Sequence, residues 1–266
     1  MNSKESIGVF DSGIGGLNVV YSLKKILPNE KIIYFGDTKN LPYGNKPPSK
    51  VKEFSLKISQ FFINKNCKLI VLACNTASAL AYDYIKKKYN TQCLLINIID
   101  PVVGYVSKFE KKKITVIGTK NTIYSDTYRK KIIELNNSIK IRSYSTPELV
   151  PIIENGFFSN SIDKIALNKS LNKIQNIDYD YLLLGCTHYP LIENKIKLLI
   201  KKKIKIINSN KIISKYIYDK LFENKLLNNK IKKNIIEIYY SKYDESFINS
   251  AKIFFGNNIK LTKHEI

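Results

Sequence analysis

Long apolar runs and closely spaced cysteines are both absent from this chain of 266 residues. No apolar run of signal-peptide length follows a basic N-terminus, and none reaches the roughly 18 residues of a membrane-spanning helix. We therefore expect a globular protein in the cytoplasm, with no membrane partner. The four cysteines, Cys67, Cys74, Cys93 and Cys186, lack the density of a disulfide framework and the spacing of a zinc knuckle, which predicts reduced thiols.

Arginine is scarce, whereas lysine is abundant. The chain has 44 Lys plus Arg against 22 Asp plus Glu, a formal charge of +22, and only Arg129 and Arg142 are arginine. Positive charge attracts nucleic acid nonspecifically, but base readout and bidentate phosphate binding favour arginine. Lys, Ile, Asn and Tyr share AT-rich codons, so we attribute the charge to genome composition and predict no specific nucleic-acid partner. We expect helix ends or turns at the runs Lys86 to Lys88, Lys111 to Lys113 and Lys201 to Lys203.

The usual motifs for a cofactor or a hydrolytic nucleophile are missing as well. The segment DSGIGGLN fails the dinucleotide-binding spacing, because the third glycine would fall at Asn18, and there is no P-loop Gly-Lys-Ser/Thr sequence. No Gly-x-Ser-x-Gly elbow is present. Cys186 and His188 are too few ligands for a closed zinc site. We therefore expect no metal and no cofactor.

Two cysteines lie in near-copies of the same local context. KLIVLACNTAS places Cys74 after an aliphatic run, and YLLLGCTHYPL does the same for Cys186. Each run reads as a strand and is followed by polar cap residues and a helical pattern, so each thiol is predicted at the carboxyl end of a strand. Open α/β sheets bind their ligands at such ends. Two equivalent thiols indicate a pair of acid/base groups that approach one substrate from opposite sides.

Strand and helix patterns alternate through the first part of the chain. Helical patterns such as Leu17 to Leu27 separate the aliphatic runs and carry apolar residues on one face. This alternation predicts an α/β fold with a parallel sheet covered on both faces. The predicted strands are Ile7 to Phe10, Lys31 to Phe35, Lys68 to Ala73 and Leu94 to Ile99.

A second series of the same kind begins at Ile114. There ITVIGT resembles IGVFDS at Ile7, and the offset between these two starts is nearly the offset between the two cysteines, which indicates two related halves. Further strands are expected at Ile206 to Ile207 and near Ile235 to Tyr240. The last helix and strand are expected to return to the first half.

Besides the two cysteines, two turns and one histidine are candidates for a functional site. In the first turn, the backbone amides and Ser12 are suited to a substrate carboxylate, whereas Asp11 fits an ammonium group, a proton transfer or a plain helix cap. The second turn, which contains Asp37, Pro42, Tyr43 and Gly44, is expected to cover a pocket. Histidine is often only a core or capping group, but His188 lies two residues after Cys186, which favours a catalytic role.

Five segments occur in a distinctive order, namely GVFDSGIGGL, YFGDTKNLPYG, VLACNTASA, VIGT and LLLGCTHYPLI, between Ile7 and about Asn208. In this order and spacing they resemble glutamate racemases, within the aspartate/glutamate racemase superfamily. The resemblance implies two similar doubly wound α/β domains with mainly parallel sheets, related by a pseudo-twofold axis, with the active site at their interface. It assigns residues 1–98 plus 209–266 to the first domain and residues 99–208 to the second.

The same resemblance implies a cofactor-independent enzyme that interconverts L-glutamate and D-glutamate and supplies D-glutamate for peptidoglycan. Cys74 would act on D-glutamate and Cys186 on L-glutamate, from opposite faces of Cα. Asp11 would assist Cys74, and His188 with Glu154 would assist Cys186. The substrate site would be lined by Asp11, Ser12, Pro42, Tyr43, Gly44, Asn75, Thr76, Thr119, Thr187 and His188.

Two alternatives stay open at this stage. A relative that acts on aspartate or on a malonate-type acid would share the scaffold, although decarboxylase relatives keep a single cysteine and this chain has both. A basic nucleic-acid-binding or interaction protein would use the lysines and have no need of the thiols. The sequence leaves a homodimer open and does not fix the oligomeric state.

Overall fold

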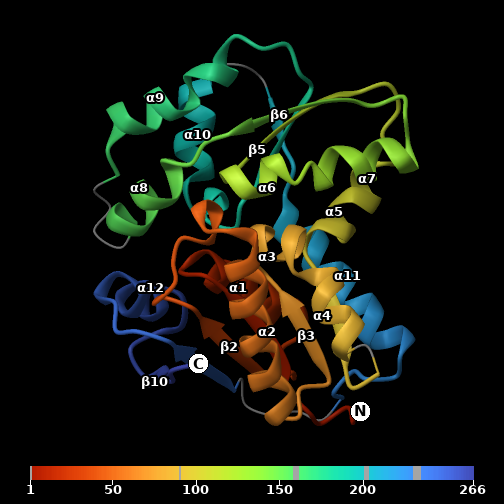
Figure 1. Cartoon of the computed structure of the whole chain (residues 1–266), viewed down its shortest axis with the longest axis vertical. Helices are drawn as coiled ribbons and strands as arrows, with labels where there is room; N and C mark the ends of the chain where they lie inside the picture. Colours follow the sequence, from red (N-terminus) through yellow and green to blue (C-terminus); the bar gives the residue numbers. More distant parts are fainter. Residues whose placement is uncertain (1, 90, 158–161, 201–203, 230–234) are drawn as a thin grey trace.

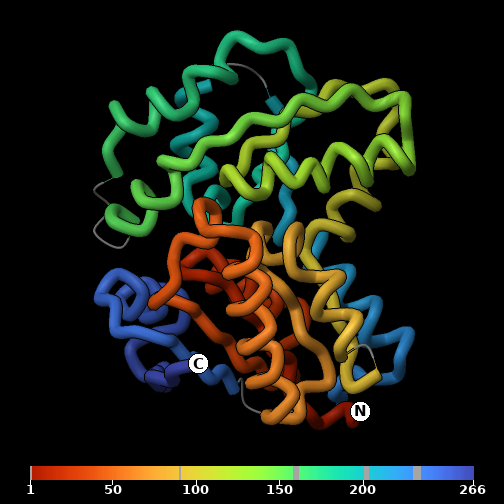
Figure 2. Tube along the Cα trace, in the orientation of Figure 1, coloured from red at the N-terminus to blue at the C-terminus, as the bar shows by residue number. Residues whose placement is uncertain are grey.

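Two parallel β-sheets, each covered by helices, form two halves of the molecule, as the computed structural model shows (Figure 1). The structure describes residues 2–89, 91–157, 162–200, 204–229 and 235–266. The strand order is β10-β9-β2-β1-β3-β4 in the first sheet and β6-β5-β7-β8 in the second. We call the parts built on these sheets the first half and the second half. Both chain ends lie in the first half (Figure 2).

Every strand pair in the two described sheets is parallel, which confirms the predicted α/β class. The first sheet contains β1 (Ile7–Asp11), β2 (Ile32–Gly36), β3 (Leu69–Leu72), β4 (Leu94–Asn97), β9 (Ile236–Tyr240) and β10 (Lys260–Lys263). The second contains β5 (Lys113–Gly118), β6 (Lys140–Ser145), β7 (Tyr181–Gly185) and β8 (Lys205–Ile206). The order β2-β1-β3-β4 repeats as β6-β5-β7-β8, so β3 and β7 are equivalent strands.

Helices pack on the sheets and leave the central strands buried. In the first half they are α1 (Gly15–Ile26), α2 (Pro48–Asn64), α3 (Asn75–Leu80), α4 (Tyr82–Tyr89) and α12 (Glu245–Phe255), with the 3₁₀ helix η1 (Tyr43–Asn45). In the second half they are α6 (Lys120–Tyr124), α7 (Thr127–Leu135), α8 (Leu149–Gly156), α9 (Lys164–Gln175), η2 (Tyr189–Ile192) and α10 (Glu193–Ile200). The aliphatic runs of β1 and β3 are fully buried, as central parallel strands require.

Two further helices, α5 (Ile99–Val106) and α11 (Ser209–Glu223), carry the chain between the halves. Helix α5 connects β4 of the first sheet to β5 of the second, and α11 follows β8 on the way back to β9. They lie side by side at the junction (Figure 1), and α11 also packs along α1. The predicted return of the final helix and strand to the first sheet is confirmed. The domain boundaries at 98/99 and 208/209 stay a prediction.

Several element limits differ from those expected from the sequence. The strand predicted over Leu94 to Ile99 ends at Asn97, because the Asn97 side chain accepts the amides of Ile99 (2.9 Å) and Asp100 (2.8 Å) and starts α5 there. Other predicted elements shift by one or two residues, and a single helix expected after Cys74 is divided into α3 and α4. Of the lysine runs, residues 86–88 do end α4, residues 111–113 lead into β5, and residues 201–203 lie outside the described residues.

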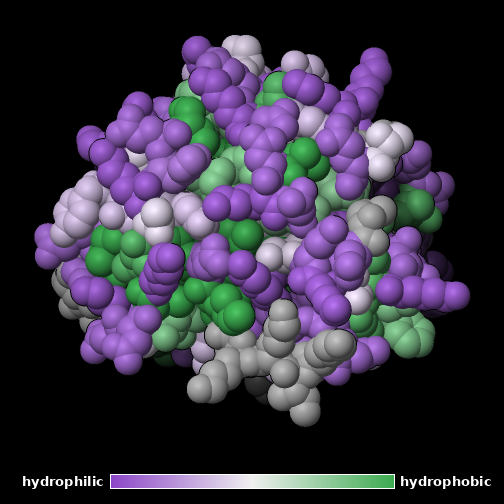
Figure 3. Space-filling model, turned by 90° about the horizontal axis from the view of Figure 1, so that it is seen from below, coloured by the Kyte–Doolittle hydropathy of each residue, from purple (hydrophilic) through white to green (hydrophobic). Residues whose placement is uncertain are grey.

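One face of the molecule is largely hydrophilic. Seen from the end that carries the N-terminus, charged and polar side chains predominate, and hydrophobic ones form separate patches between them (Figure 3). None of the described helices combines the length and apolar character needed to cross a bilayer. Two of the four cysteines, Cys67 and Cys93, are buried in the hydrophobic core of the first half.

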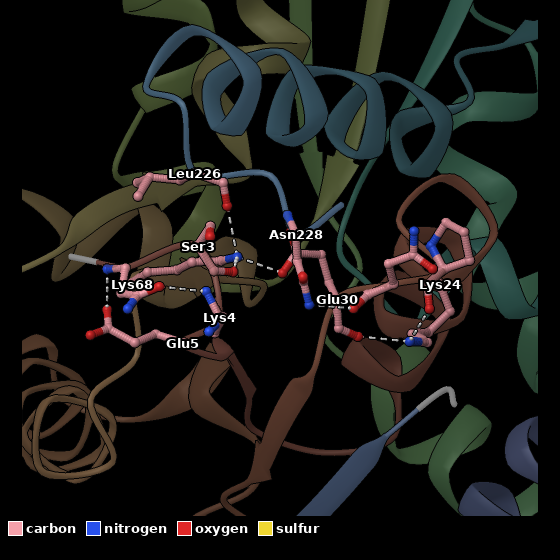
Figure 4. Close-up of polar contacts among 11 residues, drawn as sticks. Ser3, Lys4, Glu5, Lys24, Glu30, Lys68, Leu226 and Asn228 are labelled. Carbon is pink, nitrogen blue, oxygen red and sulfur yellow. Dashed lines mark hydrogen bonds and ion pairs between the residues drawn. The ribbon is translucent and has the colours of Figure 1, made fainter. Parts of the chain in front are cut away.

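A buried ion pair fastens the first half at the amino ends of its strands, away from Cys74 (Figure 4). The Lys68 ammonium donates to Glu30 Oε2 (2.6 Å) and to the carbonyls of Ser3 (2.6 Å) and Leu226 (2.8 Å). Glu30 Oε1 accepts the amide of Asn228 (2.8 Å). Burial lowers the pKa of Lys68, and Glu30 partly offsets this effect. All three ammonium donors have acceptors, so the pair joins three distant segments of the chain.

We expect Lys68→Met to lower the free energy of unfolding by about 3 to 5 kcal/mol, because Glu30 would remain buried without its cation. Urea unfolding followed by circular dichroism at pH 7 measures this loss. Lys50→Met is the matched control, since Lys50 pairs with Glu53 at 2.8 Å on the exposed surface, and it should unfold like the wild type. Equal stability of both variants would contradict the anchoring role of Lys68.

Candidate active site

The two cysteines at the ends of equivalent strands line the same small cavity. Cys74 follows β3 and is the N-cap residue of α3, and Cys186 directly follows β7 and precedes η2. The cavity has a free volume of about 10 Å³, close to the space that one water molecule needs. It is lined by Ser12, Pro42, Tyr43, Gly44, Cys74, Asn75, Thr76, Thr119, Val150, Cys186, Thr187 and His188.

All the residues expected to line a substrate site are in this lining except Asp11, which lies just behind it. Asp11 ends β1, is fully buried, and accepts the Thr187 hydroxyl on Oδ2 at 2.8 Å. It is not the cap of α1, which begins at Gly15 after Ile14. Burial raises the pKa of Asp11, against the opposing effects of His188 and the Gly13 amide. The pKa of this carboxyl is therefore higher than that of an ordinary aspartate, which favours its taking up a proton.

The glycine turn binds the protein's own carboxylates. The Gly13 amide donates to Asp11 Oδ1 (2.8 Å), and the Ile14 amide donates to Glu154 Oε1 (3.1 Å). These amides were expected from the sequence to hold a substrate carboxylate, and that expectation is wrong for these two. The reason is that Glu154 reaches the turn from α8 of the second half, which the sequence alone does not place there.

Glycine is required in this turn because the second half comes so close to it. A Cβ atom on Gly13 would lie 2.2 Å from Glu154 Oε1. A Cβ atom on Gly15 would lie 2.4 Å from Thr187 Oγ1 and 2.7 Å from His188 Nδ1. The glycines that suggest a nucleotide-binding motif in the sequence thus serve to admit side chains from the other half.

His188 links a carboxylate to one of the two thiols. Its Nε2 lies 2.5 Å from Glu154 Oε1, and its Nδ1 lies 3.7 Å from Cys186 Sγ. Burial disfavours the charged imidazole, but the Glu154 carboxylate and Cys186 outweigh that effect and raise the pKa of His188 well above 6.5. A protonated ring donates from both nitrogens. His188 is therefore a buried cation beside the sulfur of Cys186.

Cys74 has the opposite electrostatic surroundings. Burial raises the pKa of its thiol, and the nearby Asp11 carboxylate raises it further. Hydrogen bonds from the amides of Ala77 and Thr76 oppose the shift but do not cancel it. Cys74 therefore holds its proton in the resting protein.

The second turn contributes backbone and ring surface to the cavity. Tyr43 donates its hydroxyl to Asp37 Oδ2 at 2.6 Å, so this hydroxyl is already engaged. Asp37 is fully buried, does not line the cavity, and also accepts Asn40 and the Ser241 hydroxyl. Asp37 thus fixes the ring of Tyr43.

Hydroxyl and amide groups bridge the two halves around the cavity. Thr76 from α3 lies 2.9 Å from Thr119 and 3.2 Å from Thr122, measured between the Oγ1 atoms. Tyr128 donates its hydroxyl to Asn75 Oδ1 at 2.6 Å. Three residues at the site were not predicted from the sequence, namely Thr122, Tyr128 and, in the lining, Val150. Thr122 could have been found from the local sequence, because its backbone amide donates to the hydroxyl of the helix cap Thr119 three residues earlier. Tyr128 looks like any core residue of a helix.

Among the residues that the structure describes, no group of three or more His, Cys, Asp or Glu side chains could hold a metal ion. The groups that gather around the cavity are instead two thiols, two carboxyls, one imidazole and several hydroxyls. Such groups transfer protons and donate hydrogen bonds.

Comparison with known proteins places this site in a family. The model of the Asp/Glu/Hydantoin racemase family matches residues 17–217. The chain belongs to the Asp/Glu/hydantoin racemase family. Glutamate racemase 3 of Caldanaerobacter subterraneus subsp. tengcongensis is 36% identical over 258 residues, which cover 95% of this chain and 92% of that protein.

Solved structures of racemases agree with the fold. A crystal structure of Francisella tularensis glutamate racemase in complex with D-glutamate has a TM-score of 0.89 and 34% identity, covering 99% of this chain and 98% of that one. A glutamate racemase from Bacillus anthracis has a TM-score of 0.91 and 30% identity, covering 100% of this chain and 99% of that one. The resemblance seen in the sequence motifs is thereby confirmed over nearly the whole chain.

We expect Gly15→Ala to reduce racemase activity at least a hundredfold, because the new methyl group would displace Thr187 and His188 from the site. Gly104→Ala is the control, since a Cβ atom there meets nothing within 4 Å and alanine suits the interior of α5. That variant should keep full activity and gain about 0.5 to 1 kcal/mol in stability. Activity assays and thermal unfolding of both proteins give the comparison, and near wild-type activity of Gly15→Ala would contradict the close approach.

We expect the Glu154→Gln variant of this racemase to lower the pKa of His188, because the carboxylate raises it and burial would then dominate. In the wild type, His188 should stay protonated to a pH well above 6.5, whereas in the variant it should lose its proton at lower pH. Nuclear magnetic resonance of ¹⁵N-labelled histidine reads this directly, since the chain has only 2 histidines. His264, which packs against the Phe61 ring, is the internal control. Identical titration of His188 in both proteins would disprove the role of Glu154.

Proposed function

We propose that the two-cysteine cavity interconverts L-glutamate and D-glutamate by transferring a proton at Cα without a cofactor. The observation that carries this proposal is the position of Cys74 and Cys186 at the ends of equivalent strands on one small cavity. Two thiols in these positions reach opposite faces of one carbon atom. The chain is a racemase by its family, and the relatives described above, which are 30% to 36% identical to it, are glutamate racemases.

In the proposed reaction one thiolate takes the Cα proton, and its sulfur becomes a thiol. The electron pair of the broken C–H bond is delocalised into the α-carboxylate of the substrate. The other thiol then gives its proton to the opposite face of Cα and becomes the thiolate. Charge and protons balance, and the two enantiomers have equal energy, so the same site works in both directions.

The surroundings of the two sulfurs support a division of labour. Cys74 holds its proton at rest, which suits it to protonate a carbanion. Cys186 lies beside the cation of His188, which can neutralise a thiolate on that sulfur. We assign Cys186 as the base for L-glutamate and Cys74 as the base for D-glutamate, as the resemblance to glutamate racemases implies. On the Cys74 side the Asp11 carboxylate repels a thiolate, so Asp11 acts by accepting or positioning a proton.

Hydrogen-bond donors around the cavity stabilise the developing negative charge. The Tyr128 hydroxyl donates to Asn75 Oδ1, which leaves the side-chain nitrogen of Asn75 to donate to substrate. The hydroxyls of Ser12, Thr76 and Thr119 also line the cavity. Donors already fixed in a buried site lower the barrier more than solvent does, because they need no reorganisation during the reaction.

Glutamate is far larger than the free volume of about 10 Å³ in the cavity. The two halves therefore have to separate for substrate to enter and close again around it. Closure excludes water from the carbanion and brings both thiols to Cα. A cytoplasmic enzyme of this kind would supply D-glutamate for peptidoglycan, and thus for cell-wall biogenesis, as we further propose.

We expect Cys74→Ala and Cys186→Ala each to abolish racemisation, because each removes one of the two proton carriers. In D₂O, Cys74→Ala should still exchange the Cα proton of L-glutamate, and Cys186→Ala that of D-glutamate. Optical rotation and mass spectrometry follow the two processes in EDTA-treated protein without pyridoxal phosphate.

Cys67→Ala and Cys93→Ala are matched controls, since both thiols are buried in the core away from the cavity, and they should racemise glutamate normally. Retained racemisation in either active-site variant would contradict the two-base mechanism. Activity of the wild type on aspartate in place of glutamate would contradict the substrate assignment only.

A further inference from the structure

Asn121 joins the two halves through a contact that none of the site residues makes. It lies in α6 of the second half, and its side-chain amide donates to the carbonyls of Tyr43 (3.0 Å) and Lys46 (2.7 Å) in the first half. These carbonyls belong to η1 and the residue after it. A carbonyl oxygen has two lone pairs, so Asn121 adds a donor to the Tyr43 carbonyl, which already accepts the Lys46 amide, and supplies one to the Lys46 carbonyl. Asn121 itself does not line the cavity.

The loop that Asn121 holds is the one that lines the cavity from the first half. Its residues Pro42, Tyr43 and Gly44 are all in the cavity lining. The start of this loop is fixed within the first half, by Asp37 and its hydrogen bonds to the Tyr43 hydroxyl and Ser241. The backbone of η1 is fixed from the second half.

The contact lies where the two halves meet. At the same place Gly44 lies against Thr119, and a Cβ atom on Gly44 would be 2.5 Å from Thr119 Cβ. Asn121 follows Thr119 by two residues, so both contacts come from the beginning of α6. Separation of the halves to admit substrate would break both hydrogen bonds of Asn121 and release η1.

We propose that Asn121 is a positioning residue that latches the Tyr43–Lys46 loop when the two halves close over substrate. The inference rests on the proposed function, because closure over glutamate is the event that the latch serves. With the latch removed, the closed arrangement is less populated, and apparent substrate affinity falls in proportion. Bound substrate still contacts both halves, so the chemical step itself is preserved.

We expect Asn121→Ala to raise KM for L-glutamate and D-glutamate about tenfold, equivalent to about 1.4 kcal/mol, with kcat within twofold of the wild type. Asn121→Asp should raise KM further, because it places a carboxylate against two carbonyl oxygens. Asn121→Gln keeps the amide donors and should recover most of the wild-type KM. Steady-state kinetics in both directions measure these changes.

Asn136→Ala is the matched control. The Asn136 amide also bridges two carbonyls, those of Ser107 and Phe109, at 2.9 Å each, but entirely away from the cavity. In thermal unfolding, Asn136→Ala should lose about as much stability as Asn121→Ala, but it should keep the wild-type KM. A wild-type KM in Asn121→Ala, or an equal rise of KM in Asn136→Ala, would overturn the latch.

A second measurement does not depend on activity. The Lys46 amide donates to the Tyr43 carbonyl at 3.2 Å, so its hydrogen exchange reports the order of η1. Exchange in a peptide covering residues 43–47 should be about tenfold faster in Asn121→Ala than in the wild type or Asn136→Ala. Unchanged exchange would overturn the latch. If the wild type racemises no glutamate but this difference in exchange persists, the proposed substrate fails and the interdomain contact stands.

Discussion

One carboxylate oxygen, Oε1 of Glu154, holds the two halves of the site together. It accepts the Ile14 amide of the first half at 3.1 Å and faces His188 Nε2 of the second half at 2.5 Å. A carboxylate buried this deeply must keep its hydrogen bonds, because an unpaired buried charge is very costly. The same oxygen thus fixes the glycine turn, which carries Asp11 and Ser12, and sets the charge on His188. Displacing it would disturb both sides of the cavity at once.

The two halves share one topology but differ in the charges beside their cysteines. The strands β3 and β7 are equivalent, and each delivers a thiol to the cavity. Cys186 has a protonated histidine as its neighbour, whereas Cys74 has a carboxyl group. A site with two identical thiols would have no preferred resting state. The unequal surroundings define one in which each sulfur starts with a different task, and turnover exchanges those tasks.

The sequence was enough to predict the parallel α/β fold, the duplication and the strand-end cysteines, because each depends on a local pattern of aliphatic runs, turns and caps. The predicted ends of helices and strands were wrong where a side-chain hydrogen bond sets the end, as Asn97 does at the end of β4. The contacts across the interface between the halves could not be predicted from the sequence. No local sequence pattern shows that Glu154 accepts the Ile14 amide, or that Asn121 donates to the carbonyls of Tyr43 and Lys46. Such contacts depend on how two separately formed sheets are brought together.

The course of the chain has a consequence for its synthesis. Strands β9 and β10 are the last to be made, yet they pair beside β2 in the first sheet, and Lys68 finds its third acceptor only at Leu226. Domains usually fold in the order in which they leave the ribosome. Here the half that begins the chain cannot be completed until its end has emerged, so the half inserted in the middle has all its strands first. During translation the first half is therefore unfinished for a time, with the edge of β2 uncovered and Lys68 holding only two of its three acceptors, Glu30 and Ser3.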